Sequence, residues 1–288
     1  MKNLSGGVAV VTGAASGIGR ALALALAAEG MTVALADRDE KGLHETALLL
    51  ARAGGAASLH VLDVADEAAV NAFALDVLRA HGRVTIVANN AGVSIYGSVQ
   101  ELATDEIAWL MNVNFWGVVY GTKAFLPALL AEREACIVNT SSVFGLWGPP
   151  GQSAYAASKF AVRGFSEALR GELLGTGVHV LTVHPGGIKT AIARSSRVAR
   201  AADAALAAKT AKKFDERFLT TPSEVMAAAI VDGIKRKRDR VVAGTDAPRI
   251  DILTRLFPTR AARWFNRHIR AVREVTGAAA EVESSVGV

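Results

Sequence analysis

Tyr155 and Lys159 stand four residues apart in the run Tyr-Ala-Ala-Ser-Lys, a spacing that suits acid–base chemistry. Side chains four residues apart share a helix face, so the ammonium would lie near the phenol. At about 5 Å and an effective dielectric of about 20, the attraction is worth roughly 3 kcal/mol, or about two pKa units. We therefore expect Lys159 to move the pKa of Tyr155 from about 10 toward the range useful to a general acid or base.

Ser142 lies thirteen residues before Tyr155, just after Ile137 to Thr140, a run that is typical of a buried strand. Its hydroxyl can therefore reach the cleft at the end of that strand and hydrogen-bond a substrate oxygen as negative charge develops there. Ser141 is a close competitor for this role. Together with the glycine-rich turn Thr12 to Gly19 near the N-terminus, the tyrosine, the lysine and the serine predict a site for hydride transfer.

A glycine-rich turn, Thr12 to Gly19, lies between the β-branched run Val8 to Val11 and a helical stretch over residues 18–29. Its glycines permit unusual φ angles, a close approach to a pyrophosphate and tight packing of helix on strand. The N-terminus of the helix offers free N–H groups and a positive dipole to phosphates. This strand–turn–helix pattern predicts a dinucleotide site.

Asp37 follows the second predicted strand, Thr32 to Ala36, at the distance where a carboxylate can accept from the adenosine ribose. A carboxylate there favours NAD and repels a 2′-phosphate. Arg38 argues the other way, since its planar fork suits a phosphate. The balance leans to NAD, and NADP stays open.

The elements that must position these residues alternate along the chain. Strand-like runs occur at 32–36, 58–62, 84–89, 135–140 and 178–184, with helical stretches between them, the pattern of a parallel sheet covered on both faces. At 288 residues and 51% hydrophobic content, the chain can bury a substantial core without a second domain. We predict an α/β fold, a single doubly wound, Rossmann-like parallel sheet with helices on both faces, over residues 1–246, followed by a helical extension over 247–288.

In these motifs the chain resembles the common branch of the short-chain dehydrogenase/reductase family, over roughly residues 5 to 245. The motifs that carry the resemblance are Thr12 to Gly19, Asp63-Val64, Asn89-Asn90-Ala91-Gly92, Asn114, Ser142, Tyr155 with Lys159, and Pro185-Gly186. The resemblance implies a nicotinamide cofactor and the reversible interconversion of alcohols and ketones.

Residue roles follow from the same resemblance. Tyr155 would give and take the substrate proton, Lys159 would also bind the nicotinamide ribose, and Ser142 rather than Ser141 has the family's spacing to the tyrosine. Asn114 matches a fourth catalytic position, associated with a helix kink and a water relay to the lysine. The implied cofactor-binding residues are Thr12, Gly13, Ser16, Gly17, Ile18, Gly19, Asp37, Arg38, Asp63, Val64, Asn90, Ala91, Gly92, Tyr155, Lys159, Pro185, Gly186, Ile188 and Thr190.

The segments around this site are large and mostly apolar, which favours a bulky hydrophobic ketone or secondary alcohol as substrate. They contain no lysine or arginine to hold a carboxylate or phosphate. The candidate lining residues are Val93, Ile95, Tyr96, Val143, Phe144, Leu146, Trp147, Pro149 and Pro150. The stretch 191–214 resembles the family's substrate lid.

Composition excludes several other classes. No apolar run reaches the roughly 18 residues of a membrane span and no signal peptide is visible, so we expect a cytoplasmic protein. Cys136 is the sole cysteine and lies in an apolar strand, which predicts an inert thiol. The histidines show no metal-ligand spacing, so no metal is predicted, and His184 is expected to pack rather than to catalyse.

The net charge of +5 is unevenly spread, because residues 235–273 alone carry about +9. A complete enzyme site makes nucleic-acid binding unnecessary to explain it. A nucleotide-binding redox sensor or scaffold without turnover is the alternative function, and the spacing of four between tyrosine and lysine favours carbonyl over enoyl chemistry. Helical stretches near 105–131 and 153–175 resemble the pair through which the family forms homodimers and homotetramers.

The extension has an amphipathic, basic pattern. In Thr259 to Arg273, apolar residues fall on one helical face and arginines on the other, and Pro258 suits the helix start. We favour docking of the apolar face on the enzyme or a partner subunit. Reversible attachment to an anionic membrane surface is the alternative.

Overall fold

The computed structural model describes residues 1–190, 192, 195–202 and 220–274, with side chains up to residue 267. Its strands are β1 (Val8–Thr12), β2 (Thr32–Asp37), β3 (Ala57–Val61), β4 (Ile86–Asn89), β5 (Ile95–Tyr96), β6 (Ala135–Thr140), β7 (Val178–Pro185), β8 (Arg197–Val198) and β9 (Arg240–Ala243). Its helices are α1 (Gly17–Ala28), α2 (Glu40–Arg52), α3 (Glu67–His81), α4 (Thr104–Met111), α5 (Gly117–Leu130), α6 (Ser153–Glu172), α8 (Ser223–Lys235), α9 (Ala247–Leu256) and α10 (Pro258–Glu274), with a π-helical turn η1 (Asn112–Trp116) and a 3-10 turn η2 (Val143–Gly145).

One parallel sheet organises the molecule, in the strand order β3-β2-β1-β4-β6-β7-β9. Strands β1, β4 and β6 are buried along their whole length, which explains why they read as nearly continuous apolar runs. The order reverses between β1 and β4, and in such sheets ligands bind at the carboxyl ends of the strands beside that reversal. The predicted fold class is confirmed.

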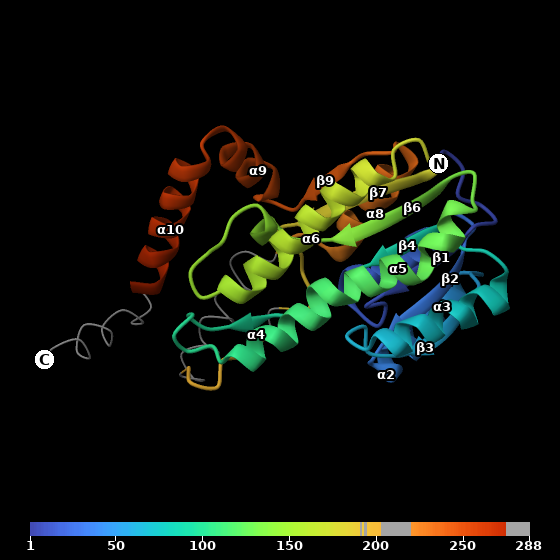
Figure 1. The fold of residues 1–288 in the computed structure, drawn as a ribbon, viewed down its shortest axis with the longest axis horizontal. Coiled ribbons are helices and arrows are strands. Elements are labelled where there is room, and N and C mark those ends of the chain that lie inside the picture. Colours follow the sequence, from blue (N-terminus) through green and yellow to red (C-terminus); the bar gives the residue numbers. More distant parts are fainter. Residues whose placement is uncertain (191, 193–194, 203–219, 275–288) are drawn as a thin grey trace, which may run out of the picture.

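Helices cover both faces of the sheet. The core on one face joins the strands to α1, α2 and α8 through residues such as Leu22, Leu50 and Ile230. The core on the other face joins them to α3, α5 and α6, and these three helices lie in front of the sheet in Figure 1. The sheet is thereby held between two apolar layers, and its carboxyl edge is the place left for polar chemistry.

The helical stretch predicted near 105–131 is present, but the π-helical turn η1 separates α4 from α5. This turn carries Asn114, which is buried. Local π geometry inside an α-helix often accompanies a functional residue. The helix kink that the resemblance implied at Asn114 therefore has a structural counterpart.

Two helices follow β9. Helix α9 begins at Ala247, which is fully buried, and a Cβ added to Gly186 would lie 2.7 Å from the Ala247 Cβ. Helix α10 begins at Pro258, as the sequence predicted. Both lie at one end of the long axis of the molecule in Figure 1. Helix α9 packs directly against the loop after β7. The division of the chain into two parts between residues 246 and 247 stays a prediction.

Candidate active site

Three of the predicted catalytic side chains meet at the carboxyl edge of the sheet. Ser142 follows β6, while Tyr155 and Lys159 lie one turn apart on α6, and all three are buried. The Ser142 side chain is close enough to the phenol of Tyr155 to act on its pKa. The spacing read from the sequence therefore brings a hydroxyl, a phenol and an ammonium to one place.

Ser141 and Ser142 have different partners. The Ser141 hydroxyl donates to the carbonyl of Lys159 at 2.8 Å, which fixes α6 against β6. The Ser142 carbonyl instead accepts from Nδ1 of His184 at 3.0 Å, and its hydroxyl accepts from the Phe144 N–H. Burial lowers the pKa of His184 to about 4, so this histidine is neutral and fits the packing role expected of it. The geometry favours Ser142 over Ser141 at the substrate.

The ionisation of Tyr155 and Lys159 differs from what the sequence predicted. Burial raises the pKa of Tyr155 to about 12, and the hydrogen bond with Ser142 offsets part of that rise. Burial also lowers the pKa of Lys159 to about 8. The prediction that the ammonium would lower the phenol pKa was wrong for this structure, because it left out the loss of water around both groups. At neutral pH the phenol is therefore protonated, ready to donate.

Lys159 is directed toward the end of β6. Its Nζ donates to the carbonyl of Thr140 at 3.0 Å and lies 5.7 Å from the centroid of the Tyr155 ring. Asn114 lies close by, since a Cβ built on Gly92 would be 3.3 Å from Asn114 Oδ1 and 3.4 Å from Lys159 Nζ. The side chain of Asn114 is locked, because it accepts from the N–H of Val93 and donates to the carbonyl of the same residue. The fourth predicted residue thus lies beside the lysine.

The glycine turn has the backbone that its sequence predicts. Gly13 and Gly17 have φ angles of +69° and +54°, in the left-handed region that favours glycine. A Cβ on Gly19 would collide with the carbonyl of Gly13, so this position also needs hydrogen as its side chain. Ser16 and Ile18 flank Gly17 at the start of α1, where backbone N–H groups face outward. The turn is a cradle that fits a pyrophosphate.

Neighbouring loops close around this turn. The Thr12 hydroxyl accepts from the N–H groups of Asn90 and Ala91 at 3.0 and 3.1 Å, joining the ends of β1 and β4. After β7 and Pro185, Ile188 is buried, and the methyl group of Thr190 lies 3.2 Å from a Cβ built on Gly17. The structure thus gathers the predicted cofactor residues around the switch point of the sheet.

The two acidic cofactor positions lie at the ends of β2 and β3. Asp37 accepts from the backbone N–H of Ala15 and of Asp39, so its carboxylate is tied to the glycine turn. Arg38 is exposed. Asp63 is also exposed, whereas Val64 is buried against Gly117.

An aromatic wall extends from the tyrosine to the C-terminal helix. We use this name for Phe144, Trp147 and Phe265. The ring of Phe144 meets Tyr155 edge-on at 6.1 Å and Trp147 at 5.8 Å, and Trp147 packs on Phe265 at 5.0 Å. The indole N–H of Trp147 also donates to Oδ1 of Asn266 at 3.1 Å. The extension therefore contributes directly to the surroundings of the site, and Asn266 is a residue that the sequence analysis missed.

Other candidate substrate residues have different positions. Ile95 is fully buried in a small core with Leu102 and Leu110. It therefore supports the site by packing and does not line the surface that a substrate would meet. A cation also lies near this segment, because Arg197 on β8 pairs with β5 and stacks on Trp109 at 3.7 Å. Most of the proposed lid at 191–214 lies outside the described residues.

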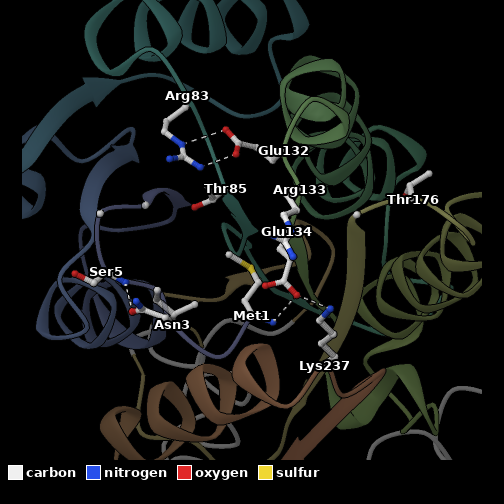
Figure 2. Close-up of a pocket in the computed structure, with 14 residues that line it drawn as sticks. Met1, Asn3, Ser5, Arg83, Thr85, Glu132, Arg133, Glu134, Thr176 and Lys237 are labelled. Atoms are coloured by element: carbon white, nitrogen blue, oxygen red, sulfur yellow. Dashed lines mark hydrogen bonds and ion pairs between the residues drawn. The ribbon is translucent and has the colours of Figure 1, made fainter.

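A depression at the opposite edge of the sheet is shown in Figure 2. Its charges are largely paired, with Arg83 bound to Glu132 and Lys237 bound to Glu134, both at 2.6 Å. It faces the amino ends of the strands, away from the edge where such sheets bind ligands. We assign it no chemistry.

Within the described part of the chain, no three His, Cys, Asp or Glu side chains gather as a metal site requires. Burial raises the pKa of Cys136 to about 12, consistent with an inert thiol. None of the described helices is long and apolar enough to cross a membrane. The cytoplasmic location stays a prediction.

The family model of short chain dehydrogenases matches residues 7–201, more than half of the chain. The chain belongs to this family. As a short chain dehydrogenase, it is an NAD(P)-dependent oxidoreductase. The resemblance that the motifs indicated is confirmed.

Relatives of this dehydrogenase extend over most of its length. "Putative oxidoreductase SadH" from Mycobacterium tuberculosis is 47% identical over 258 residues, which cover 89% of this chain and 92% of the relative. A short chain dehydrogenase/reductase from Burkholderia phymatum in complex with NAD is 35% identical, with a TM-score of 0.78, covering 84% of this chain and 90% of that one. A metagenomic short-chain oxidoreductase in complex with NADP is 30% identical, with a TM-score of 0.69, covering 84% and 98%. The expected cofactor class, NAD or NADP, is the one that these two structures hold.

Proposed function

We propose that the protein is an alcohol dehydrogenase and ketone reductase acting on bulky hydrophobic secondary alcohols or ketones. The observation that carries this proposal is that the buried side chains of Ser142, Tyr155 and Lys159 come together beside the glycine turn, at the switch point of the sheet. A buried, protonated phenol beside a serine hydroxyl suits proton transfer to a carbonyl oxygen.

The residues divide the work as follows. Ser142 donates a hydrogen bond to the substrate oxygen, and Tyr155 gives that oxygen a proton in reduction or removes one in oxidation. Lys159 places positive charge beside the phenol whenever the phenol loses its proton. The residues around the glycine turn would hold the nicotinamide cofactor, which supplies or accepts the hydride when bound. Asn114 positions the loop at Val93 beside the lysine.

The aromatic wall supports a hydrophobic substrate. Phe144 lies edge-on to the catalytic ring, and Trp147 continues the apolar surface toward α10. Apolar pockets with a few placed polar groups are the usual sites for such ligands. Arg197 is stacked on Trp109 at 3.7 Å, so its charge is held against an aromatic ring.

A panel of aromatic, steroid-like and aliphatic ketones tests this function, with oxidation of NADH and NADPH followed by absorbance. We expect turnover of at least one hydrophobic class and weak or no turnover of short keto acids. The alternative, a redox sensor or scaffold, predicts tight nucleotide binding and no turnover of any ketone.

The structure supports NAD as the preferred cofactor, because Asp37 is held by two backbone N–H groups and cannot easily turn away from a ribose. Replacing Asp37 by Ser removes the charge that repels a 2′-phosphate. We expect the ratio of kcat/KM with NADPH to that with NADH to rise at least about tenfold, or about 1.4 kcal/mol. Steady-state kinetics with both cofactors measures it. Arg38→Ala is the control: it should leave kcat/KM with NADH unchanged, and a fall with NADPH alone would identify Arg38 as the phosphate ligand.

We also propose a homodimer or homotetramer built on α5 and α6. Phe160 is exposed on α6, and Trp116, at the end of η1 just before α5, is exposed and stacks on Tyr120 of α5 at 5.8 Å. Exposed apolar clusters of this kind mark association sites. Size-exclusion chromatography with light scattering should give the mass of two or four chains, and a monomer at micromolar concentration would contradict the proposal.

A further inference from the structure

Helix α9 presents a row of large apolar side chains to solvent. Ile252 and Leu256 are 55% and 66% exposed, and Phe257, just after the helix, is 51% exposed. Leu253 lies beside them, and residues three and four apart share a helix face. On α10, Trp264 is 53% exposed. We call these five residues the α9–α10 face.

This face is distinct from the side by which the helices dock. Ala247 and Ala261 are buried, and Asp251 binds Arg240 on β9 at 2.6 Å. Phe265 packs on Trp147 inside the aromatic wall. The two helices are therefore fixed to the enzyme by one side, and the apolar face is exposed. Figure 1 shows both helices at one end of the long axis of the molecule.

The charges next to this face select its partner. Residues 247–267 contain a single carboxylate, the already paired Asp251, and five exposed arginines: Arg249, Arg255, Arg260, Arg263 and Arg267. A two-fold contact between two copies through this face would set the same arginines against each other, which is unfavourable. An anionic lipid surface offers hydrocarbon to the apolar side chains and negative headgroups to the arginines.

We propose that the α9–α10 face binds reversibly to membranes that contain anionic lipid. The helices lie on the surface, with Leu256, Phe257 and Trp264 entering the boundary between headgroups and acyl chains. Arginines close to the surface add to the attraction, and salt screens this part of it. The proposal does not depend on which alcohol or ketone the enzyme converts.

The test is co-sedimentation of the full chain with two kinds of vesicle, phosphatidylcholine alone and phosphatidylcholine with an equal share of phosphatidylglycerol. We expect sedimentation with the second kind only, and release at high salt. Leu256→Ser with Phe257→Ser, and separately Arg260→Gln with Arg263→Gln, should each lower the partition coefficient at least about tenfold. Leu174→Ser is the matched control, since Leu174 is 80% exposed after α6, and it should bind as the parent does.

Thermal unfolding and light scattering of each variant without vesicles separate this proposal from a structural role. Unchanged unfolding and mass, together with lost sedimentation, support it. If the full chain ignores anionic vesicles, or binds both kinds equally at any salt concentration, the proposal is overturned. It is also overturned if the serine variant falls apart into smaller species, since the face is then a subunit contact. The glutamine variant keeps the test decisive if the serine variant unfolds.

Discussion

Replacing Tyr155 by Phe is expected to lower kcat by at least about a hundredfold in either direction of the reaction, because it removes the proton donor and leaves the ring. The ring should keep its edge-on contact with Phe144 at 6.1 Å. Among the described residues, the loss falls on the interaction of the phenol with the Ser142 side chain, so stability should fall by about 1 kcal/mol or less. The measurement is steady-state turnover beside the dissociation constant for NADH, which should change little.

Tyr120→Phe provides the control for this substitution. Tyr120 lies on α5, stacks on Trp116 and is not among the predicted site residues, so the same loss of one hydroxyl should leave turnover intact. Near-normal turnover of the Tyr155 variant would remove the tyrosine from the mechanism. The proton donor would then be another group at the carboxyl edge of the sheet.

Replacing Lys159 by Met should inactivate the enzyme and at the same time stabilise the fold. Turnover should fall at least about a hundredfold, because no positive charge remains beside the phenol. Burial holds the pKa of Lys159 at about 8 instead of 10.5, and this shift corresponds to a destabilisation of about 3 kcal/mol at neutral pH. Losing the hydrogen bond to Thr140 opposes the gain by about 1 kcal/mol, which leaves about 2 kcal/mol in favour of the variant.

The pH dependence of this difference has a definite sign. Below pH 8 the lysine is protonated in both the folded and the unfolded chain, and the folded chain bears the full penalty of a buried ammonium. Between pH 8 and 10.5 only the unfolded chain keeps the proton, so the advantage of the variant shrinks and then vanishes. Urea unfolding at several pH values measures this. Lys123→Met, at an exposed position on α5, should show no such trend, and a Lys159 variant less stable than the parent at pH 7 would refute the prediction.

The sequence predicted much of the fold because its signals are local. Strand β1 is apolar from Val8 to Val11, and the turn after it needs hydrogen side chains at Gly13 and Gly19. Tyr155 and Lys159 are one helical turn apart. Each of these patterns is read within a few residues. The strand β9 was missed because its four residues follow a highly charged stretch and only one of them, Val241, is buried.

Contacts between distant segments could not be read in this way. The pKa of Tyr155 depends on how completely the surrounding elements exclude water, which no spacing of two residues reports. The hydrogen bond between Trp147 and Asn266 joins residues 119 positions apart, and an asparagine in a basic helix carries no signal of it. The sequence favoured docking of the extension on the enzyme and left attachment to a membrane surface as the alternative. The contacts of Trp147 with Asn266 and Phe265 are contacts of the docked kind.

The hydrogen bond between Trp147 and Asn266 bears on the order in which the chain folds during synthesis. The glycine turn and Tyr155 leave the ribosome well before Asn266, which follows Trp147 by 119 residues. At about 5–20 residues per second, this interval is on the order of ten seconds. A nascent chain can therefore complete its nucleotide cradle while Trp147 still lacks its partner on α10. The capacity to hold a cofactor should then arise during synthesis earlier than the capacity to choose a substrate.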